Sequence, residues 1–293
     1  MHTSEKSSTF AAKLIKSQIP TNMAQVTFET LNPKAKLFAE LKSGKYAWWE
    51  KVKANPDLYI EIRKDNNINV YYQGGSVIRL HYCSRHKRVQ AFTHAKYLNG
   101  KGKDYIECAD QLDDVLDRII ASIPKYYSQK KGTNKKNWSE KFIQSQYILK
   151  YHTLYLDSEF AYKEDPYDIR VDLIECADGI IRFVELKRLD DGRMLKKSDD
   201  SPEVVDQVNS YRRFIQEYEA KIIEYYKKLW CIKNDLNLPN TCEPKEVSKE
   251  PLLLIFNRWP NTNPRREEHT RRMEEILQRK NIDYVIESEI CML

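Results

Sequence analysis

The spacing of hydrophobic and polar residues divides the chain into two parts with different patterns. Residues 58–70 alternate apolar and polar positions around a polar triplet, which predicts two strands joined by a turn. The pair Gly74 and Gly75 predicts a second turn, and residues 77–82 a third strand. In residues 111–123 the apolar positions recur at helical spacing. The first part is therefore predicted to be a small α+β domain.

The second part begins after a basic stretch at 125–137, which contains five lysines, one glycine and no acid. Such a composition predicts a solvated linker. The elements expected after it are a helix from Ser139, strands at 155–162, 169–176 and 180–188, a long helix after Pro202, a strand at 252–256, a helix from Asn263 and a strand at 284–286. We therefore expect an α/β fold with a mixed central sheet over 139–293, preceded by an α+β domain over 1–124 and a linker over 125–138.

Composition and missing motifs exclude several functional classes. The longest apolar runs are far shorter than the ~18 residues that cross a bilayer, and the first twenty residues lack a signal-peptide pattern, so no membrane partner is expected. The chain contains no GxxxxGK[ST], GxGxxG or GxSxG, so we expect neither a nucleotide cofactor nor a hydrolase serine. Six cysteines without CxxC spacing predict reduced thiols and a cytoplasmic location. The net charge of +6 is compatible with a nucleic-acid partner.

The segment 168–188 carries the candidate chemistry. Asp178 and Gly179 are the preferred pair for a two-residue hairpin turn, and this turn places Asp172 opposite Glu185. The pleat brings Lys187 to the same face as Glu185 and opposite Arg170.

The other face of this hairpin is predicted to be apolar and buried, and it consists of Val171, Leu173, Val184 and Leu186. Two facing carboxylates repel each other unless a cation offsets the repulsion. Oxygen ligands of this kind suit Mg²⁺, and a lysine beside the ion can stabilise a phosphate under attack. The geometry predicts phosphodiester hydrolysis.

Asp172, twelve further residues and then Glu185-Leu186-Lys187 resemble the signature of the PD-(D/E)XK nuclease superfamily, whose fold is restriction-endonuclease-like. The αβββαβ order over 139–257 resembles the core of that family. Val171 stands where many members have proline. The N-terminal part lies outside the resemblance.

The resemblance implies an Mg²⁺-dependent endonuclease acting on DNA, with Mn²⁺ able to substitute, in bacterial restriction or anti-phage defence. It implies metal ligation by Asp172 and Glu185, with the Leu186 carbonyl as a further ligand, and catalysis by Lys187. It also implies an extra metal-site acid at Glu140 or Glu159 and an orienting role for Gln207, which forms a QxxxY pattern with Tyr211.

Less specific interpretations of the same residues stay open. The hairpin can be an edge hairpin whose surface lysine bridges two acids, and Glu140 an ordinary first-turn acid of its helix. Candidates for phosphate contact are Arg170, Lys130, Lys131, Lys135 and Lys136, although a solvated face is the default for the linker lysines. RNA or branched DNA as substrate, a non-cleaving binding subunit, a homodimer and a defence-system partner protein also remain open.

Overall fold

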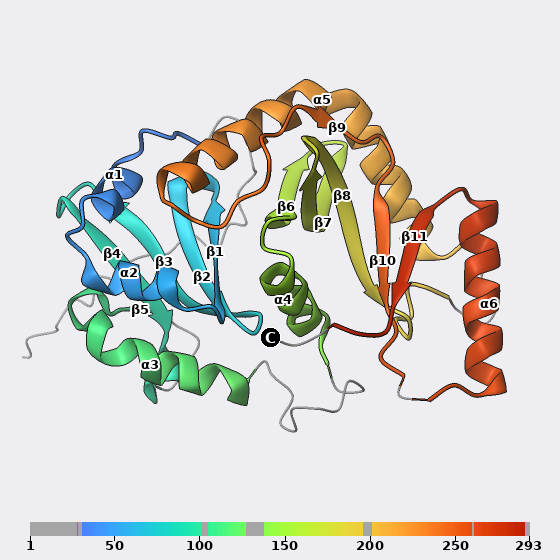
Figure 1. Ribbon diagram of the computed structural model, residues 1–293, viewed down its shortest axis with the longest axis horizontal. Helices are drawn as coiled ribbons and strands as arrows, with labels where there is room; N and C mark the ends of the chain where they lie inside the picture. The colour runs from blue at the N-terminus through green and yellow to red at the C-terminus, as the bar shows by residue number, and fades with distance from the viewer. Residues whose placement is uncertain are drawn as a thin grey trace, which may run out of the picture.

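The computed structural model describes residue 28 and residues 31–100, 105–126, 138–195, 201–259 and 261–290. The strands form two sheets, and helices pack against both of them (Figure 1). The chain is therefore mixed α/β, as its hydrophobic pattern predicts.

The N-terminal sheet is antiparallel, and its five strands lie in chain order. These strands are β1 (Leu58–Arg63), β2 (Asn67–Tyr72), β3 (Gly75–Cys83), β4 (Arg88–His94) and β5 (Tyr105–Glu107). The α-helices of this part are α1 (Lys36–Lys42), α2 (Ala47–Ala54) and α3 (Leu112–Ser122), and short 3₁₀ turns are η1 (Lys64–Asn66), η2 (Ala95–Leu98), η3 (Ala109–Gln111) and η4 (Ile123–Lys125). The three predicted strands and the predicted helix are confirmed, whereas β4 and β5 enlarge the sheet beyond the prediction.

The second sheet is mixed. Its strand order is β11-β10-β8-β7-β6, with antiparallel pairing from β6 to β8 and parallel pairing from β8 through β10 to β11. The strands are β6 (Tyr155–Glu164), β7 (Tyr167–Ala177), β8 (Ile180–Arg188), β10 (Leu252–Phe256) and β11 (Asp283–Glu287). A two-residue strand, β9 (Glu246–Val247), pairs with β8 and was not predicted. Every predicted strand of this part is confirmed.

Helices cover both faces of the mixed sheet. These helices are α4 (Glu140–Lys150), α5 (Glu203–Asp235) and α6 (Pro264–Arg279). Ser139 is the N-cap of α4, because its side chain accepts the Phe142 N–H, and Asn263 caps α6 in the same way. One hydrophobic cluster joins α4 to Leu173, Val184 and Leu186, and another joins α5 and α6 to β10. The sheet therefore lies between α4 on one face and α5 with α6 on the other.

The long helix α5 arches over both sheets in Figure 1. A single hydrophobic cluster contains residues of β2, β6 and α5, among them Val70, Phe160 and Tyr226. At its far end α5 also pairs with α1, through Asp235 and Lys42. The two sheets therefore share a buried core. The boundary expected at 125–138 falls largely outside the described residues, so the division into domains stays a prediction.

No helix within the described ranges combines the length and the apolar character that a bilayer-spanning segment needs.

Candidate active site

The hairpin of β7 and β8 has the register that its turn predicts. Ala177 pairs with Ile180, and the ladder continues in step to Leu173 and Val184. Asp178 and Gly179 both have positive φ, 51° and 84°, as the two-residue turn requires. Continued by one position, this register would place Asp172 opposite Glu185, but the ladder stops at Leu173 and Val184.

The hydrogen-bonded ladder ends at Asp172. Its carboxylate oxygen Oδ2 accepts the Leu186 N–H at 2.9 Å, and its own carbonyl accepts a hydrogen bond from Gln144 of α4 at 2.5 Å. A side-chain oxygen and an amide from α4 therefore satisfy groups that the neighbouring strand would otherwise pair. As a result the Asp172 carboxylate is held between the two strands and close to Glu185.

The expectation of one continuous apolar face is wrong at Val171. Leu173, Val184 and Leu186 pack in the α4 cluster as expected, but Val171 belongs to the cluster on the α5 side. The alternation of β7 slips at Asp172, where the ladder to β8 is broken. On β6 the facing position is Glu159, whose φ of 53° is left-handed and ends the regular alternation there as well.

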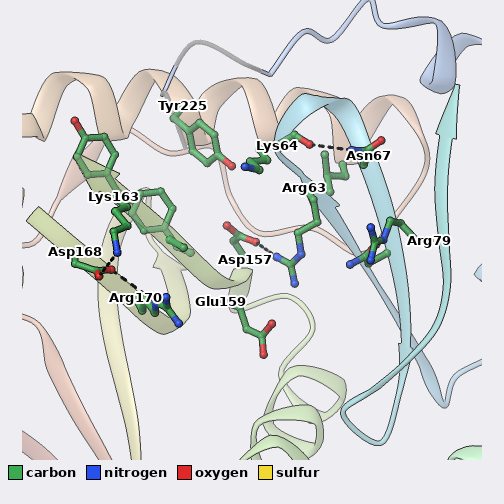
Figure 2. A pocket seen from close by; sticks show the side chains of 15 residues that line it. Arg63, Lys64, Asn67, Arg79, Asp157, Glu159, Lys163, Asp168, Arg170 and Tyr225 are labelled. Carbon is green, nitrogen blue, oxygen red and sulfur yellow. Dashed lines mark hydrogen bonds and ion pairs between the residues drawn. The ribbon is translucent and has the colours of Figure 1, made fainter. Parts of the chain in front are cut away.

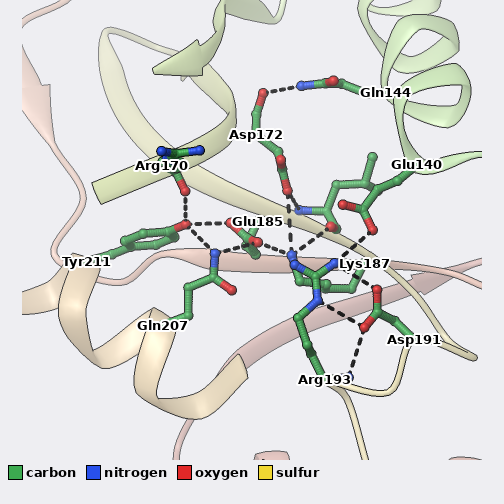
Figure 3. Close-up of polar contacts among 11 residues, drawn as sticks. Glu140, Gln144, Arg170, Asp172, Glu185, Lys187, Asp191, Arg193, Gln207 and Tyr211 are labelled. Atoms are coloured by element: carbon green, nitrogen blue, oxygen red, sulfur yellow. Dashed lines mark hydrogen bonds and ion pairs between the residues drawn. The ribbon is translucent and has the colours of Figure 1, made fainter. Parts of the chain in front are cut away.

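Glu185 and Lys187 are almost completely buried, with 2% and 1% of their side chains exposed. The Lys187 ammonium donates to Glu185 Oε1, donates to the Leu186 carbonyl at 3.2 Å and lies 3.8 Å from Asp172 Oδ2. Figure 3 shows the three side chains converging on one point. The predicted grouping of these residues is therefore present. The burial also excludes the alternative of a solvated edge hairpin.

Two residues of α5 hold the Glu185 carboxylate in place. Gln207 Nε2 donates to Glu185 Oε1 at 2.6 Å and to the Tyr211 hydroxyl oxygen at 2.8 Å. The Tyr211 hydroxyl lies 2.5 Å from Glu185 Oε2 and also contacts the Arg170 carbonyl, so these two acceptors share its proton. Because Gln207 and Tyr211 are four residues apart, one helix face presents both to β8.

The site carries more negative charge than its own cations balance. Burial, and then the charge of Glu185, raise the pKa of Asp172 to about 7, although Lys187 and the Leu186 N–H oppose the shift. Burial, and then the charge of the Glu185 carboxylate, raise the pKa of Tyr211. Asp172, at 28% side-chain exposure, is the more accessible of the two facing acids. A cation placed beside Asp172 and Glu185 would relieve this repulsion.

Glu140 lies at the edge of the same site. Burial raises its pKa, while Lys187 opposes the shift and Asp172 adds to it. Arg193 contacts Glu140 at 3.4 Å and Asp191 at 2.8 Å (Figure 3). The hydrogen bond from Arg193 lowers the pKa of Asp191 to about 2. Glu140 is therefore the predicted extra acid that the structure places with the carboxylate pair.

Glu159 is held elsewhere. Its carboxylate forms a 2.6 Å ion pair with Lys141. Burial acts to raise the pKa of Glu159, but the charges of Lys141 and Arg63 together outweigh it and lower the pKa. It lines a cavity between the two sheets and not the Asp172–Glu185 site. Arg170 lines the same cavity, two residues before Asp172, with a 61% exposed side chain. Lys130, Lys131, Lys135 and Lys136 lie outside the described residues.

Three residues of the site were not predicted from the sequence, and they are Gln144, Asp191 and Arg193. Gln144 lies one helical turn after Glu140, so the i, i+4 spacing on α4 was a usable signal. Asp191 and Arg193 lie in the loop after β8, where no periodicity indicates the direction of a side chain. The cavity between the sheets could not be found from sequence, because it depends on how the two sheets pack.

The donor set at the hairpin fits a hard divalent cation. Asp172, Glu185 and the Leu186 carbonyl offer only oxygen, the ligand type that Mg²⁺ prefers, and Mg²⁺ sites usually hold one or two carboxylates plus water and phosphate. In the described ranges, no three His, Cys, Asp or Glu side chains form a ready metal cage. The arrangement thus suits an ion that keeps several waters better than a closed zinc site.

No known protein-family model, curated protein or solved structure matches this chain.

Proposed function

We propose that the chain is an Mg²⁺-dependent nuclease that hydrolyses phosphodiester bonds in DNA. The observation that carries the proposal is the convergence of Asp172, Glu185 and the fully buried Lys187 at the end of the β7–β8 ladder. Burying the Glu185 carboxylate and the Lys187 ammonium costs stability because charged groups lose their hydration, and a function of the site would explain why this cost is kept.

The residues that would hold the ion are Asp172 and Glu185, with the Leu186 carbonyl as a third oxygen. When bound, Mg²⁺ would activate a water molecule and neutralise charge on the phosphate. Lys187 has its ammonium between the two carboxylates and would stabilise negative charge that develops on the phosphate oxygens. Gln207 and Tyr211 would keep the Glu185 carboxylate in one orientation.

We also propose that residues 139–293 form a restriction-endonuclease-like core. The support is the order α4-β6-β7-β8-α5-β10 and the mixed sheet with the carboxylate pair on its central hairpin. A role in bacterial defence is a proposal that follows from the resemblance to the nuclease superfamily, and a cytoplasmic location is one that follows from six cysteines without CxxC spacing. A homodimer or a partner protein remains open.

Cleavage assays test the proposed activity. The wild-type chain is incubated with plasmid, single-stranded DNA, branched DNA and RNA, in Mg²⁺ and in EDTA. We expect cleavage of DNA in Mg²⁺ alone, Mn²⁺ to substitute, and a loss of at least ~100-fold in Asp172→Asn and Lys187→Met.

The matched control is Glu175→Gln, which removes another carboxylate from β7, at a position that faces Arg182 in the ladder and lies nearer the turn than Asp172. The control is expected to cleave like the wild type. Cleavage that survives EDTA, or wild-type rates in both site variants, would refute the assigned site. Cleavage of RNA alone would replace DNA as the substrate.

A further inference from the structure

A cavity of about 400 Å³ lies between the two sheets, beside the proposed active site. Its walls come from β1, η1, β2 and β3 on one side and from β6 and β7 on the other (Figure 2). This volume falls within the range of sites that hold one small molecule. The N-terminal part, for which no role is otherwise assigned, thus supplies half of a site.

The charge of the cavity favours an anion. Five cations line it against three carboxylates, and the cations are Arg63, Lys64, Arg79, Lys163 and Arg170. Asp157 is engaged by Arg63 at 3.1 Å, Asp168 by Lys163 at 3.1 Å, and Glu159 by Lys141 from outside the lining. Arg79 has no carboxylate within ion-pair distance among the described residues, and it lies over the Tyr105 ring at 4.8 Å.

The cavity also offers apolar and amide surface. Ile62, Phe160 and Tyr225 form its apolar lining, and Asn67 and Asn69 face it from β2. Asn69 donates to the Tyr71 hydroxyl at 3.0 Å, but its buried Oδ1 has no hydrogen-bond partner in the described part of the chain. A buried acceptor without a partner is costly, and a ligand N–H would satisfy it. Asparagine amides commonly pair with the edge of a base.

The position of the cavity relates it to the active site. Arg170 lines the cavity, and Asp172 lies two residues along the same strand, about 7 Å away at the rise of a β-strand. A strand with its phosphate at Asp172 and Glu185 therefore has a neighbouring nucleotide within reach of the cavity.

We propose that this cavity holds one unpaired nucleotide of the substrate strand. Its phosphate lies on the Arg79 side, and the edge of its base lies at Asn69 Oδ1. The inference rests on the proposed nuclease function and specifies its substrate class: strands with an unpaired nucleotide beside the cleaved bond. A base that is paired in a duplex has its edge occupied and its faces stacked, so it does not fit.

Binding measurements in Ca²⁺, which replaces Mg²⁺ to prevent cleavage, test this proposal. Fluorescence anisotropy compares a labelled twelve-nucleotide single strand with the matching duplex. We expect the single strand to bind at least ~10-fold more tightly, and Asn69→Ala and Arg79→Gln each to weaken single-strand binding ~5- to 10-fold with little change for the duplex. Arg85→Gln, in the exposed β3–β4 turn, is the charge-matched control and is expected to bind like the wild type.

Equal binding of both DNAs, or unchanged single-strand binding in both cavity variants, would overturn the proposal. Titration with dAMP forms a further arm: tight, Asn69-dependent dAMP binding that the single strand does not displace would assign the cavity to a free nucleotide instead. Cleavage under Mg²⁺ is recorded in parallel. Asn69-dependent strand binding without cleavage refutes the nuclease function alone, whereas cleavage without Asn69-dependent binding refutes the cavity assignment alone.

Discussion

Asp172 connects the local structure of the hairpin to its chemistry. One of its oxygens replaces a ladder contact by accepting the Leu186 N–H, and the carboxylate lies beside Glu185, with Lys187 as the nearest cation. The repulsion between the Asp172 and Glu185 carboxylates therefore lowers the stability of the fold, as is often seen at functional sites.

Replacing Asp172 by Asn is expected to stabilise the metal-free protein. An amide oxygen still accepts the Leu186 N–H, while the repulsion with Glu185 disappears. We expect the thermal midpoint at pH 8 to rise by roughly 2–3 °C, the equivalent of about 1–2 kcal/mol, when measured in EDTA. A lower midpoint than that of the wild type would contradict the repulsion argument.

Tyr211 is a positioning residue, because it acts through Glu185. Tyr211→Phe removes the hydroxyl at 2.5 Å from Oε2 and keeps the ring. We expect Mn²⁺ binding, measured by calorimetry, to weaken ~10- to 100-fold. The control is Tyr167→Phe, which removes a hydroxyl bonded to Glu217 at an exposed position and is expected to leave Mn²⁺ binding unchanged. Equal Mn²⁺ affinity in both variants would contradict the role of Tyr211.

The grouping of Asp172, Glu185 and Lys187 could be predicted because a two-residue turn fixes the register as far as Leu173 and Val184, one position before Asp172 and Glu185. The choice between Glu140 and Glu159 could not be made. Glu140 is the first residue of α4 and Glu159 lies in β6, so both belong to elements expected in the core. Only the packing of α4 against β8 brings Glu140 to the site. The change of face between Val171 and Leu173 could not be predicted either. It depends on the broken ladder at Asp172 and on the left-handed backbone of Glu159, the facing residue of β6.

At the scale of elements, the β2–β3 turn supports the helix that carries Glu140. Gly74 has φ of +82°, and a Cβ there would lie 2.7 Å from the Lys141 carbonyl in the first turn of α4. The N-terminal sheet therefore touches α4 one residue from the site. This contact links sequence segments that no local pattern could have paired.

Gly74→Ala is expected to destabilise the protein by more than the cost of positive φ alone. Gly44→Ala is a matched control, because Gly44 has φ of +74° but nothing within 4 Å of the added Cβ. We expect Gly74→Ala to lower the free energy of unfolding by about 1–3 kcal/mol more than Gly44→Ala in urea titrations. Equal losses in the two variants would show that the contact with α4 does not matter.

At the scale of the whole molecule, a buried polar network lies where the two sheets meet. Asp157 of β6 accepts hydrogen bonds from Arg63 of β1 at 3.1 Å and from the Ser158 N–H at 2.8 Å, and Glu61 accepts from the Ser158 hydroxyl at 2.9 Å. Burial, and then the charge of Glu61, raise the pKa of Asp157 to about 7. The interface between the sheets is thus sensitive to pH.

This network gives stability a defined pH dependence. With a folded pKa near 7 and an unfolded pKa of about 3.9, the contribution of Asp157 is fully present below about pH 4 and is lost as pH rises through 7. Asp157→Asn lacks this titration. We expect its stability relative to the wild type to increase between pH 4 and 7, by at most about 1.4 kcal/mol per pH unit, and to level off above. A difference that is independent of pH in urea titrations would contradict the assignment.

The shared core predicts how the chain unfolds. Because one hydrophobic cluster includes residues of both sheets and α5, we expect a single calorimetric transition and not two separate ones. The sequence indicated two patterns and a basic linker, which favour separate domains. The sequence could not indicate that α5 packs against both sheets. The apolar stripe of a helix shows that the helix packs against something, but it does not identify the partner surface. Two resolved transitions would restore the simple two-domain interpretation.

The central claim is that the β7–β8 hairpin binds a divalent cation for phosphodiester hydrolysis. Anomalous scattering from crystals soaked in Mn²⁺ together with a DNA strand tests it most directly. We expect one strong peak bounded by the Asp172 and Glu185 carboxylates and the Leu186 carbonyl, and its loss in Asp172→Asn. Saturating Mn²⁺ with no peak between these groups would rule out a divalent cation at this hairpin.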